Sequence, residues 1–187
     1  MSTFNRVARI VATILLAAPF VASAATWNYR IGEEAPSFAL KGLDGKPLSS
    51  ADLRGHYTVV SFMTSWCPFC NAAAPYFDKI GKDYAAKGVR AVIVDVHEKR
   101  APIAAFVKKY ALSCPMLLDK DGGVATRYAP PPDFVPDLER ETIMIASFMI
   151  VDPQGKIVFL SLNEKPEEFD AKLTKLRGRL DELLAGK

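Results

Sequence analysis

The chain has 187 residues, of which 50% are hydrophobic and 24% charged, so it is long enough to bury one substantial core. Its formal net charge is only +3, and no basic tract with interleaved aromatic residues occurs. Setting aside Arg6 and Arg9, which lie in the N-terminal segment described next, leaves 22 basic against 21 acidic residues. This balance argues against nucleic-acid binding.

Residues 1–24 have the three parts of a secretory signal peptide. Arg6 and Arg9 form a positive start, an apolar stretch follows, and Ala22-Ser23-Ala24 is a small-residue cleavage site. The alternative is an uncleaved membrane anchor, but the apolar stretch is shorter than the roughly 20 residues that a span needs. We therefore expect cleavage, a periplasmic location and no stable membrane insertion afterwards. Residues 25–33 would then form a short lead segment.

The first elements expected in the mature chain are a β-hairpin and a buried strand. Residues 38–41 and 46–48 flank Gly42-Leu43-Asp44-Gly45, a turn sequence typical of a hairpin. A brief helix through Leu53 should follow. Residues 57–63 are apolar and rich in β-branched side chains, which predicts a buried strand.

Cys67-Pro68-Phe69-Cys70 follows this strand, where a helix running to about Lys87 is expected to begin. At a helix start, the Cys67 sulfur would lie near unpaired backbone N–H groups and the positive end of the dipole, which favour the thiolate. Cys70 lies one turn further on, close enough to form a disulfide with Cys67. This spacing makes Cys67 the candidate attacking sulfur and Cys70 the resolving one.

Two other interpretations of the CxxC pair are weaker. A zinc site would need a second pair of ligands, and the remaining cysteine and two histidines are not in ligand spacing. An inert structural disulfide would be unusual in so short a loop at a helix start. The sequence context therefore favours a redox role.

The second half of the chain alternates between further strands and helices. Residues 89–96 predict a strand parallel to the first, because a helix connects the two. The later elements expected are a helix with a core-facing stripe at 103–110, an extended segment at 113–118, a proline-rich surface loop at 129–145 with one possible helical turn at 137–141, a hairpin of 146–151 with 157–162, and a helix at 166–185. We expect the leucine stripe of the last helix to pack on the sheet, with a dimer-forming coiled coil as the alternative.

Three further features carry possible chemistry. His97 falls in the loop after the second strand and is expected to be a solvated loop residue. Cys114 is expected to be a small buried hydrophobe, with a third redox thiol that exchanges with Cys67, or a dimer disulfide, as alternatives. The loop at 129–145 is either a plain insertion or a lid or partner-docking surface beside the active site.

The sequence Thr64-Ser65-Trp66-Cys67-Pro68-Phe69-Cys70 after an apolar strand resembles the thioredoxin superfamily, and more narrowly its exported TlpA/ResA-like branch. Segments at 32–40, 43–48, 53–55, 117–122 and 150–157 are similar to other landmarks of that branch. The resemblance implies a thioredoxin-like α/β domain over 34–187. Its fold would be a central mixed β-sheet flanked by helices, with an N-terminal β-hairpin extension and the inserted loop at 129–145.

The resemblance also implies an enzyme that exchanges disulfides with protein substrates through Cys67 and Cys70. It implies a reductant, of the type that keeps cytochrome c or copper-site cysteines reduced, supplied by a membrane thiol donor. No cofactor and no metal are implied. Pro68 and Phe69 bring no charge to stabilise the thiolate, which argues against a very strong oxidant.

Three positions depart from the family pattern. Ala146, preceded by Ile145, stands where a cis-proline is usual, so the backbone edge that binds the substrate is expected to be shaped differently. Ala73 replaces a glutamate that would tune thiol protonation. Ser61 replaces a buried aspartate, so proton transfer to and from Cys70 must use water or other groups.

These departures leave two other functions open. A peroxiredoxin-like thiol peroxidase would use Thr64, but its companion proline and arginine would fall at Val60 and Ala146. A non-enzymatic copper or haem carrier would use the two CxxC sulfurs as soft ligands. Such a carrier would also need a methionine or His97 nearby.

Overall fold

The computed structural model describes residues 30–131, 139–163 and 166–186. The predicted signal peptide at 1–24 lies outside the described residues, as does most of the lead segment. The end of that segment pairs with the domain, because the Gly32 N–H donates to the Ile157 carbonyl at 2.8 Å and the Ile157 N–H donates to the Glu33 carbonyl at 2.9 Å.

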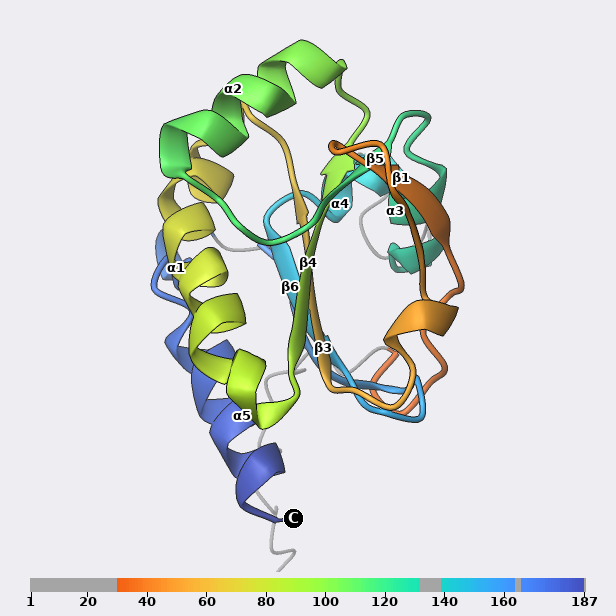
Figure 1. Cartoon of the computed structure of the whole chain (residues 1–187), viewed down its shortest axis with the longest axis vertical. Helices are drawn as coiled ribbons and strands as arrows, with labels where there is room; N and C mark the ends of the chain where they lie inside the picture. The colour runs from red at the N-terminus through yellow and green to blue at the C-terminus, as the bar shows by residue number, and fades with distance from the viewer. Residues whose placement is uncertain (1–29, 132–138, 164–165, 187) are drawn as a thin grey trace, which may run out of the picture.

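A seven-stranded mixed sheet forms the centre of the described part of the chain (Figure 1). Its strands, in the order β2-β1-β5-β4-β3-β6-β7, are β1 (Ala39–Gly42), β2 (Pro47–Ser49), β3 (Thr58–Met63), β4 (Arg90–Val96), β5 (Met116–Asp119), β6 (Ser147–Val151) and β7 (Ile157–Ser161). The strands β3, β4 and β5 are parallel, and both terminal hairpins are antiparallel. The predicted mixed sheet with an N-terminal hairpin is confirmed.

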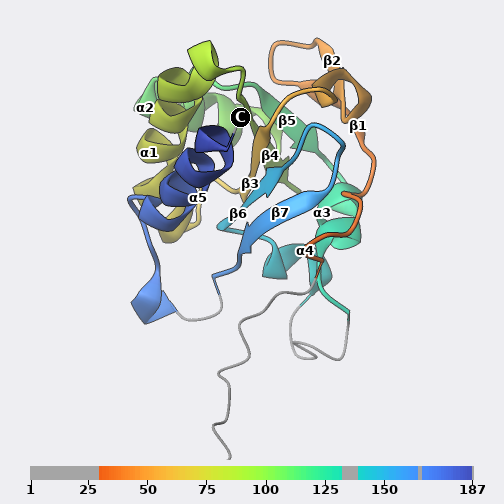
Figure 2. The same cartoon turned by 90° about the horizontal axis from the view of Figure 1, so that it is seen from below.

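Helices cover both faces of this sheet (Figures 1 and 2). The helices α1 (Pro68–Tyr84), α2 (Arg100–Tyr110) and α5 (Thr174–Ala185) lie on one face, and α3 (Gly123–Tyr128) and α4 (Arg140–Ile143) lie on the other. Short 3-10 turns occupy Ala51–Leu53, Ala85–Lys87 and Pro166–Glu168. Among the helices described, none is long and apolar enough to cross a membrane.

The central strand β3 is buried along its whole length, so its alternating side chains feed two cores. Val59 and Met63 belong to the first core, which packs against α1, α2 and α5. Val60 and Phe62 belong to the second core, on the side of α3 and α4. Covering on both faces explains why residues 57–63 show a continuous apolar run rather than an alternating pattern.

The last helix is shorter than predicted. It begins at Thr174 rather than near residue 166, because Leu173 has a left-handed φ of 57° that interrupts a helix. The Asp170 carboxylate then accepts hydrogen bonds from the Thr174 hydroxyl at 2.8 Å and the Lys175 N–H at 2.9 Å. Leu173, Leu176 and Leu180 are buried in the first core, so the predicted packing of the leucine stripe on the sheet is confirmed.

The proline-rich segment at 129–145 is not a surface loop at either end. Ala129 and Met144 are both fully buried in the second core. The Arg140 guanidinium donates to the carbonyls of Thr126 and Ala129, both at 3.1 Å, which ties α4 to α3. Residues 132–138 lie outside the described part of the chain, and the six-residue α3 before them was not predicted.

Candidate active site

The junction between β3 and α1 places the two cysteines of the CxxC sequence. Cys67 is the N-cap residue of α1, with extended φ and ψ angles of −73° and 121°. Pro68 occupies the first helical position, where a missing N–H costs nothing. The Cys67 Sγ accepts a hydrogen bond from the Cys70 backbone N–H at 3.3 Å, as a capping side chain does. The predicted helix start at the CxxC pair is therefore confirmed.

Cys67 and Cys70 are both free thiols, and their pKa values are shifted in opposite directions. A hydrogen bond from the Cys70 side chain, helped by the backbone N–H groups of Cys70 and Phe69, lowers the pKa of Cys67 to about 6 despite its burial. Burial, followed by the Cys67 sulfur and its charge, raises the pKa of Cys70 well above its ordinary value. At neutral pH the pair therefore consists of one thiolate and one thiol.

Access to Cys67 is narrow. The Cys67 residue is only 4% exposed, whereas the preceding Trp66 is 64% exposed. The Phe69 ring turns inward and packs edge-on against Phe169, with ring centroids 5.0 Å apart. Of the two aromatic residues beside the cysteines, Trp66 thus offers the larger apolar surface to a partner.

Asn71 ties the loop before α1 to helix α2. Its side-chain amide donates to the carbonyls of Ser65 and Cys67, both at 2.8 Å. The amide oxygen accepts from the Tyr110 hydroxyl at 2.8 Å and from the Lys109 ammonium at 3.2 Å. These four bonds fix the backbone on both sides of Trp66 and so hold Cys67 in its capping position.

Glu98 holds the same loop from the end of β4. Its carboxylate accepts hydrogen bonds from the Ser65 N–H at 2.5 Å and from the Ser65 hydroxyl at 2.6 Å. Together with Asn71, Glu98 leaves Ser65 with its N–H, hydroxyl and carbonyl all paired. A rigid loop of this kind holds the Cys67 sulfur in a fixed position between α1 and the solvent.

A model of the AhpC/TSA family matches residues 31–160, which is well over half of the chain. The chain belongs to the AhpC/TSA family. It is 29% identical over 139 residues to the thiol-disulfide oxidoreductase ResA of Bacillus cereus (strain ZK / E33L), covering 74% of this chain and 73% of that protein. It is also 29% identical over 127 residues to ResA of Bacillus subtilis (strain 168), covering 68% and 64%.

Solved structures agree with this family assignment. A protein from Bacteroides thetaiotaomicron, solved in solution, superposes with a TM-score of 0.68 at 27% identity, covering 83% of this chain and 91% of that one. A secreted disulfide oxidoreductase of Mycobacterium tuberculosis gives a TM-score of 0.54 at 27% identity, with coverages of 74% and 95%. The predicted thioredoxin-like fold, the TlpA/ResA-like membership and the class of enzyme, thiol–disulfide oxidoreductase, are confirmed.

Within this family fold, Ala146 occupies an unusual backbone conformation. Its φ is 64°, in the left-handed region that costs an alanine roughly 1 kcal/mol or more, and the Ile145–Ala146 peptide is trans. The Ala146 N–H donates to the Phe62 carbonyl at 2.9 Å. The expected difference in the shape of this backbone edge takes the form of a left-handed turn beside Cys70.

Ser61 and Ala73, the other two departures, carry no charge into the site. The Ser61 hydroxyl is fully buried and donates to the Ser147 carbonyl at 3.0 Å, so it is committed to the sheet. Ala73 is fully buried in the first core. Neither residue can exchange a proton with Cys70.

Asp95 is a buried acid that the sequence analysis missed. It is fully buried near the end of β4, and neither carboxylate oxygen has a hydrogen-bond partner. Burial, followed by the charge of Glu98, raises the pKa of Asp95 to about 8. The signal was present in the run RAVIVDV, because strand alternation puts Asp95 on the same face as Ile93 of the first core.

The remaining candidates lie outside the thiol pair. His97 is exposed, as expected of a solvated loop residue. Cys114 is half-buried and packs against the first core, and a Cβ added to Gly81 would lie 2.7 Å from its sulfur. Burial, followed by the nearby Asp78 carboxylate, raises the pKa of Cys114 to about 12, which disfavours its thiolate.

Of the three positions that the peroxidase alternative uses, Thr64 and Ala146 lie beside Cys70, whereas Val60 does not. Val60 points into the second core, on the other face of the sheet, and the Thr64 hydroxyl is buried with no hydrogen-bond partner. Within the described ranges, no group of three or more His, Cys, Asp or Glu side chains is placed to hold a metal ion.

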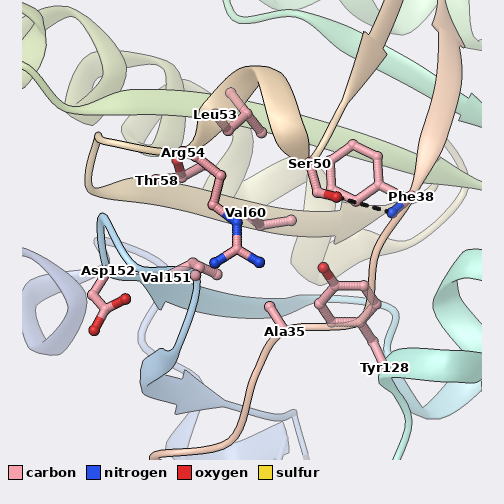
Figure 3. Close-up of a pocket in the computed structure, with 11 residues that line it drawn as sticks. Ala35, Phe38, Ser50, Leu53, Arg54, Thr58, Val60, Tyr128, Val151 and Asp152 are labelled. Carbon is pink, nitrogen blue, oxygen red and sulfur yellow. Dashed lines mark hydrogen bonds between the residues drawn. The ribbon is translucent and has the colours of Figure 1, made fainter.

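A separate pocket lies on the second-core side of the sheet (Figure 3). Phe38, Val60 and Tyr128 contribute to its walls, and the guanidinium of Arg54 points into it. Arg54 is already paired with Glu34 at 2.7 Å. No cysteine lines this pocket, so it is distinct from the thiol pair.

Proposed function

We propose that the chain is an exported thiol–disulfide reductase in which Cys67 is the nucleophile and Cys70 the resolving thiol. The Cys67 thiolate attacks a disulfide of a protein substrate and forms a mixed disulfide, releasing one substrate sulfur. Cys70 then attacks Cys67, which releases the second substrate sulfur and leaves a disulfide between residues 67 and 70. Read in reverse, the same steps would oxidise a substrate.

The observation that carries these roles is the difference between the two thiols. Cys67 is the N-cap of α1, and its pKa is lowered to about 6. Cys70 is fully buried, and its pKa is raised. A thiol with a pKa near or below ambient pH supplies the attacking thiolate, and a shielded thiol is suited to the intramolecular second step.

Several features support the direction, location and partners. The Pro68-Phe69 pair brings no charge that would further stabilise a thiolate, which favours a reductant over a strong oxidant. The substrates proposed are protein disulfides of the cytochrome c maturation or copper-site type, with electrons from a membrane thiol donor. The signal-peptide pattern predicted at 1–24 supports a periplasmic location, with residues 34–187 as the thioredoxin-like domain.

The test is the reduction potential of the Cys67–Cys70 pair in the mature chain, titrated against defined thiol buffers. A value near or below about −200 mV supports a reductant, and a value near about −120 mV would instead indicate an oxidant. The variant Cys70→Ser should trap a mixed disulfide through Cys67, whereas Cys67→Ser should trap none. Absence of any reversible two-electron couple would refute thiol–disulfide exchange and favour a metal or haem carrier.

A further inference from the structure

Helix α2 lies across the end of α1 that begins at the cysteine pair (Figure 1). Hydrogen bonds tie both of its ends to the loop that carries Cys67. Just before α2, the Glu98 carboxylate accepts from the N–H and the hydroxyl of Ser65. Near the other end, Lys109 donates to the Asn71 side-chain oxygen at 3.2 Å, and the Asn71 amide donates to the Cys67 carbonyl at 2.8 Å. The surface of α2 therefore borders the opening to Cys67.

This border is basic. Four exposed cations form what we call the basic rim: Lys99, Arg100, Lys108 and Lys109. Helix α2 contains no acidic residue, and the nearest acid in the chain, Glu98, is bonded to Ser65. None of the four cations forms a salt bridge with an acidic residue of the described ranges. The positive charge of the rim therefore acts on whatever approaches Cys67 from this side.

The other side of the cysteine pair carries the opposite charge. Phe69, between the two cysteines, packs against Phe169 with ring centroids 5.0 Å apart. The segment around Phe169, residues 166–171, contains three acidic residues and no basic one. The two cysteines thus lie between a basic and an acidic side.

Narrow access makes these two sides relevant to a substrate. The Cys67 residue is only 4% exposed, so a disulfide reaches its sulfur only when the chain beside that disulfide lies against the surrounding surface. Trp66, 64% exposed and next to Cys67 in the chain, offers an apolar contact at the centre of that surface. Charged residues that flank the substrate cysteine then meet the basic rim on one side and residues 166–171 on the other.

We propose that the basic rim selects protein substrates whose disulfide cysteine is flanked on one side by acidic residues. These acidic residues lie on α2, while Trp66 covers the apolar residues next to the substrate cysteine. Complementary charge of this kind raises the encounter rate and fixes orientation more than it raises affinity. This inference rests on the proposed thiol–disulfide exchange, for which it names the class of substrate.

The experiment uses three short peptides, each with one cysteine in a disulfide with the chromophore thionitrobenzoate. One peptide is uncharged beside its cysteine, and the other two carry a pair of glutamates either before or after it. The reduced mature chain, in a Cys114→Ser background, is mixed with limiting peptide, and the rate of chromophore release is followed by stopped-flow absorbance. In about 10 mM salt one of the two acidic peptides should react about three- to tenfold faster than the uncharged peptide, and in about 0.5 M salt the gain should fall below about twofold.

The variant Lys99→Gln with Lys109→Gln removes two charges of the basic rim, and glutamine keeps an amide that can donate to Asn71. It should lose most of the preference for the acidic peptide while reacting with the uncharged peptide at the rate of the wild type. The matched control is Lys87→Gln with Lys156→Gln, which removes two exposed charges at the far end of the sheet. Lys87 follows α1, and Lys156 precedes β7 in a turn that meets the beginning of β3. This control should keep the preference.

Two results would overturn the proposal. One is an equal rate for all three peptides in low salt, and the other is an unchanged preference in Lys99→Gln with Lys109→Gln. In both cases reaction with the uncharged peptide would leave the proposed thiol–disulfide exchange intact. If the wild type releases no chromophore from any peptide, that exchange itself is refuted, and the role of the basic rim is refuted with it.

Discussion

Asp95 of β4 and Asp119 of β5 are buried aspartates on adjacent strands, and their side chains lie on opposite faces of the sheet. The Asp119 carboxylate accepts the backbone N–H groups of Val124 at 3.1 Å and Ala125 at 2.8 Å, so it holds the first turn of α3 in the second core. The Asp95 side chain lies on the other face, on the side of the first core, and Glu98 is the main charged group near it. Of these two buried acids, one has its carboxylate oxygens bonded to the backbone of α3, and the other lies close to the negative charge of Glu98.

The largest expected effect concerns the reactivity of the Cys67 thiol and its dependence on pH. Because the pKa of Cys67 is lowered to about 6, the rate of its attack should fall about tenfold per pH unit below pH 6 and level off above pH 7. The measurement is the rate of alkylation of Cys67 in the wild type, with the variant Cys70→Ala beside it. Loss of the Cys70 thiol should move the inflection to higher pH, since its side chain is the main cause of the lowered pKa. A wild-type inflection near pH 9 would contradict the assigned thiolate.

On the opposite face, Asp119→Ala should destabilise the fold by about 2 kcal/mol, because it leaves two buried N–H groups of α3 unpaired. Urea denaturation at pH 7 measures this loss. The matched control is Asp121→Ala, an exposed neighbour that accepts one N–H, from Gly123, and should cost less than half as much. An Asp119→Ala protein as stable as wild type would show that Asp119 does not act as a cap.

The variant Asp95→Asn should change stability in the opposite direction, by increasing the free energy of unfolding. The folded pKa of Asp95 is raised from 3.8 to about 8, so the native state binds the proton more tightly than the unfolded chain. This contribution to stability is complete below about pH 4 and is lost as pH rises to about 8. The variant should therefore gain roughly 1 kcal/mol or more over wild type at pH 8 and little at pH 4. Equal stability differences at both pH values would contradict an ionising Asp95.

The smallest expected effect comes from Asn71, whose side chain ties the loop before α1 to α2. Asn71→Ala removes the amide that binds the carbonyls of Ser65 and Cys67, and we expect a loss of about 1 kcal/mol in unfolding free energy. A less constrained Cys67 should also show a higher pKa. Lys79→Ala, an exposed change in the same helix, is the control and should alter neither value. An unchanged Cys67 pKa in Asn71→Ala would show that the Asn71 hydrogen bonds do not position the Cys67 sulfur.

Much of the fold could be predicted because local pattern and tertiary structure agree there. The apolar run at 57–63, the CxxC helix start and the run at 89–96 all became the elements expected of them. The six-residue helix α3 was missed because it depends on Asp119, a residue outside it, to hold its first turn. The last helix was placed too early because a left-handed residue, Leu173, breaks an otherwise regular leucine spacing.

The candidate site was predictable only in part, because some of its interactions are local in the sequence and others join distant residues. The spacing of Cys67 and Cys70 pointed directly to the chemistry, because both lie in one local motif. The interactions of Asn71 were not visible in the sequence, since its partner Tyr110 lies 39 residues away. The burial of Asp95 depends on packing of the sheet against helices from distant parts of the chain, although strand alternation already put it on the inner face.

Trp66, exposed beside a nearly buried Cys67, gives the molecule an internal optical signal. A disulfide next to an indole ring quenches its fluorescence more than a thiol does, so emission should rise when the 67–70 pair is reduced. The other tryptophan, Trp27, precedes the described residues, and Trp27→Phe would leave Trp66 as the single emitter. The state of the cysteines could then be followed in real time without any added dye.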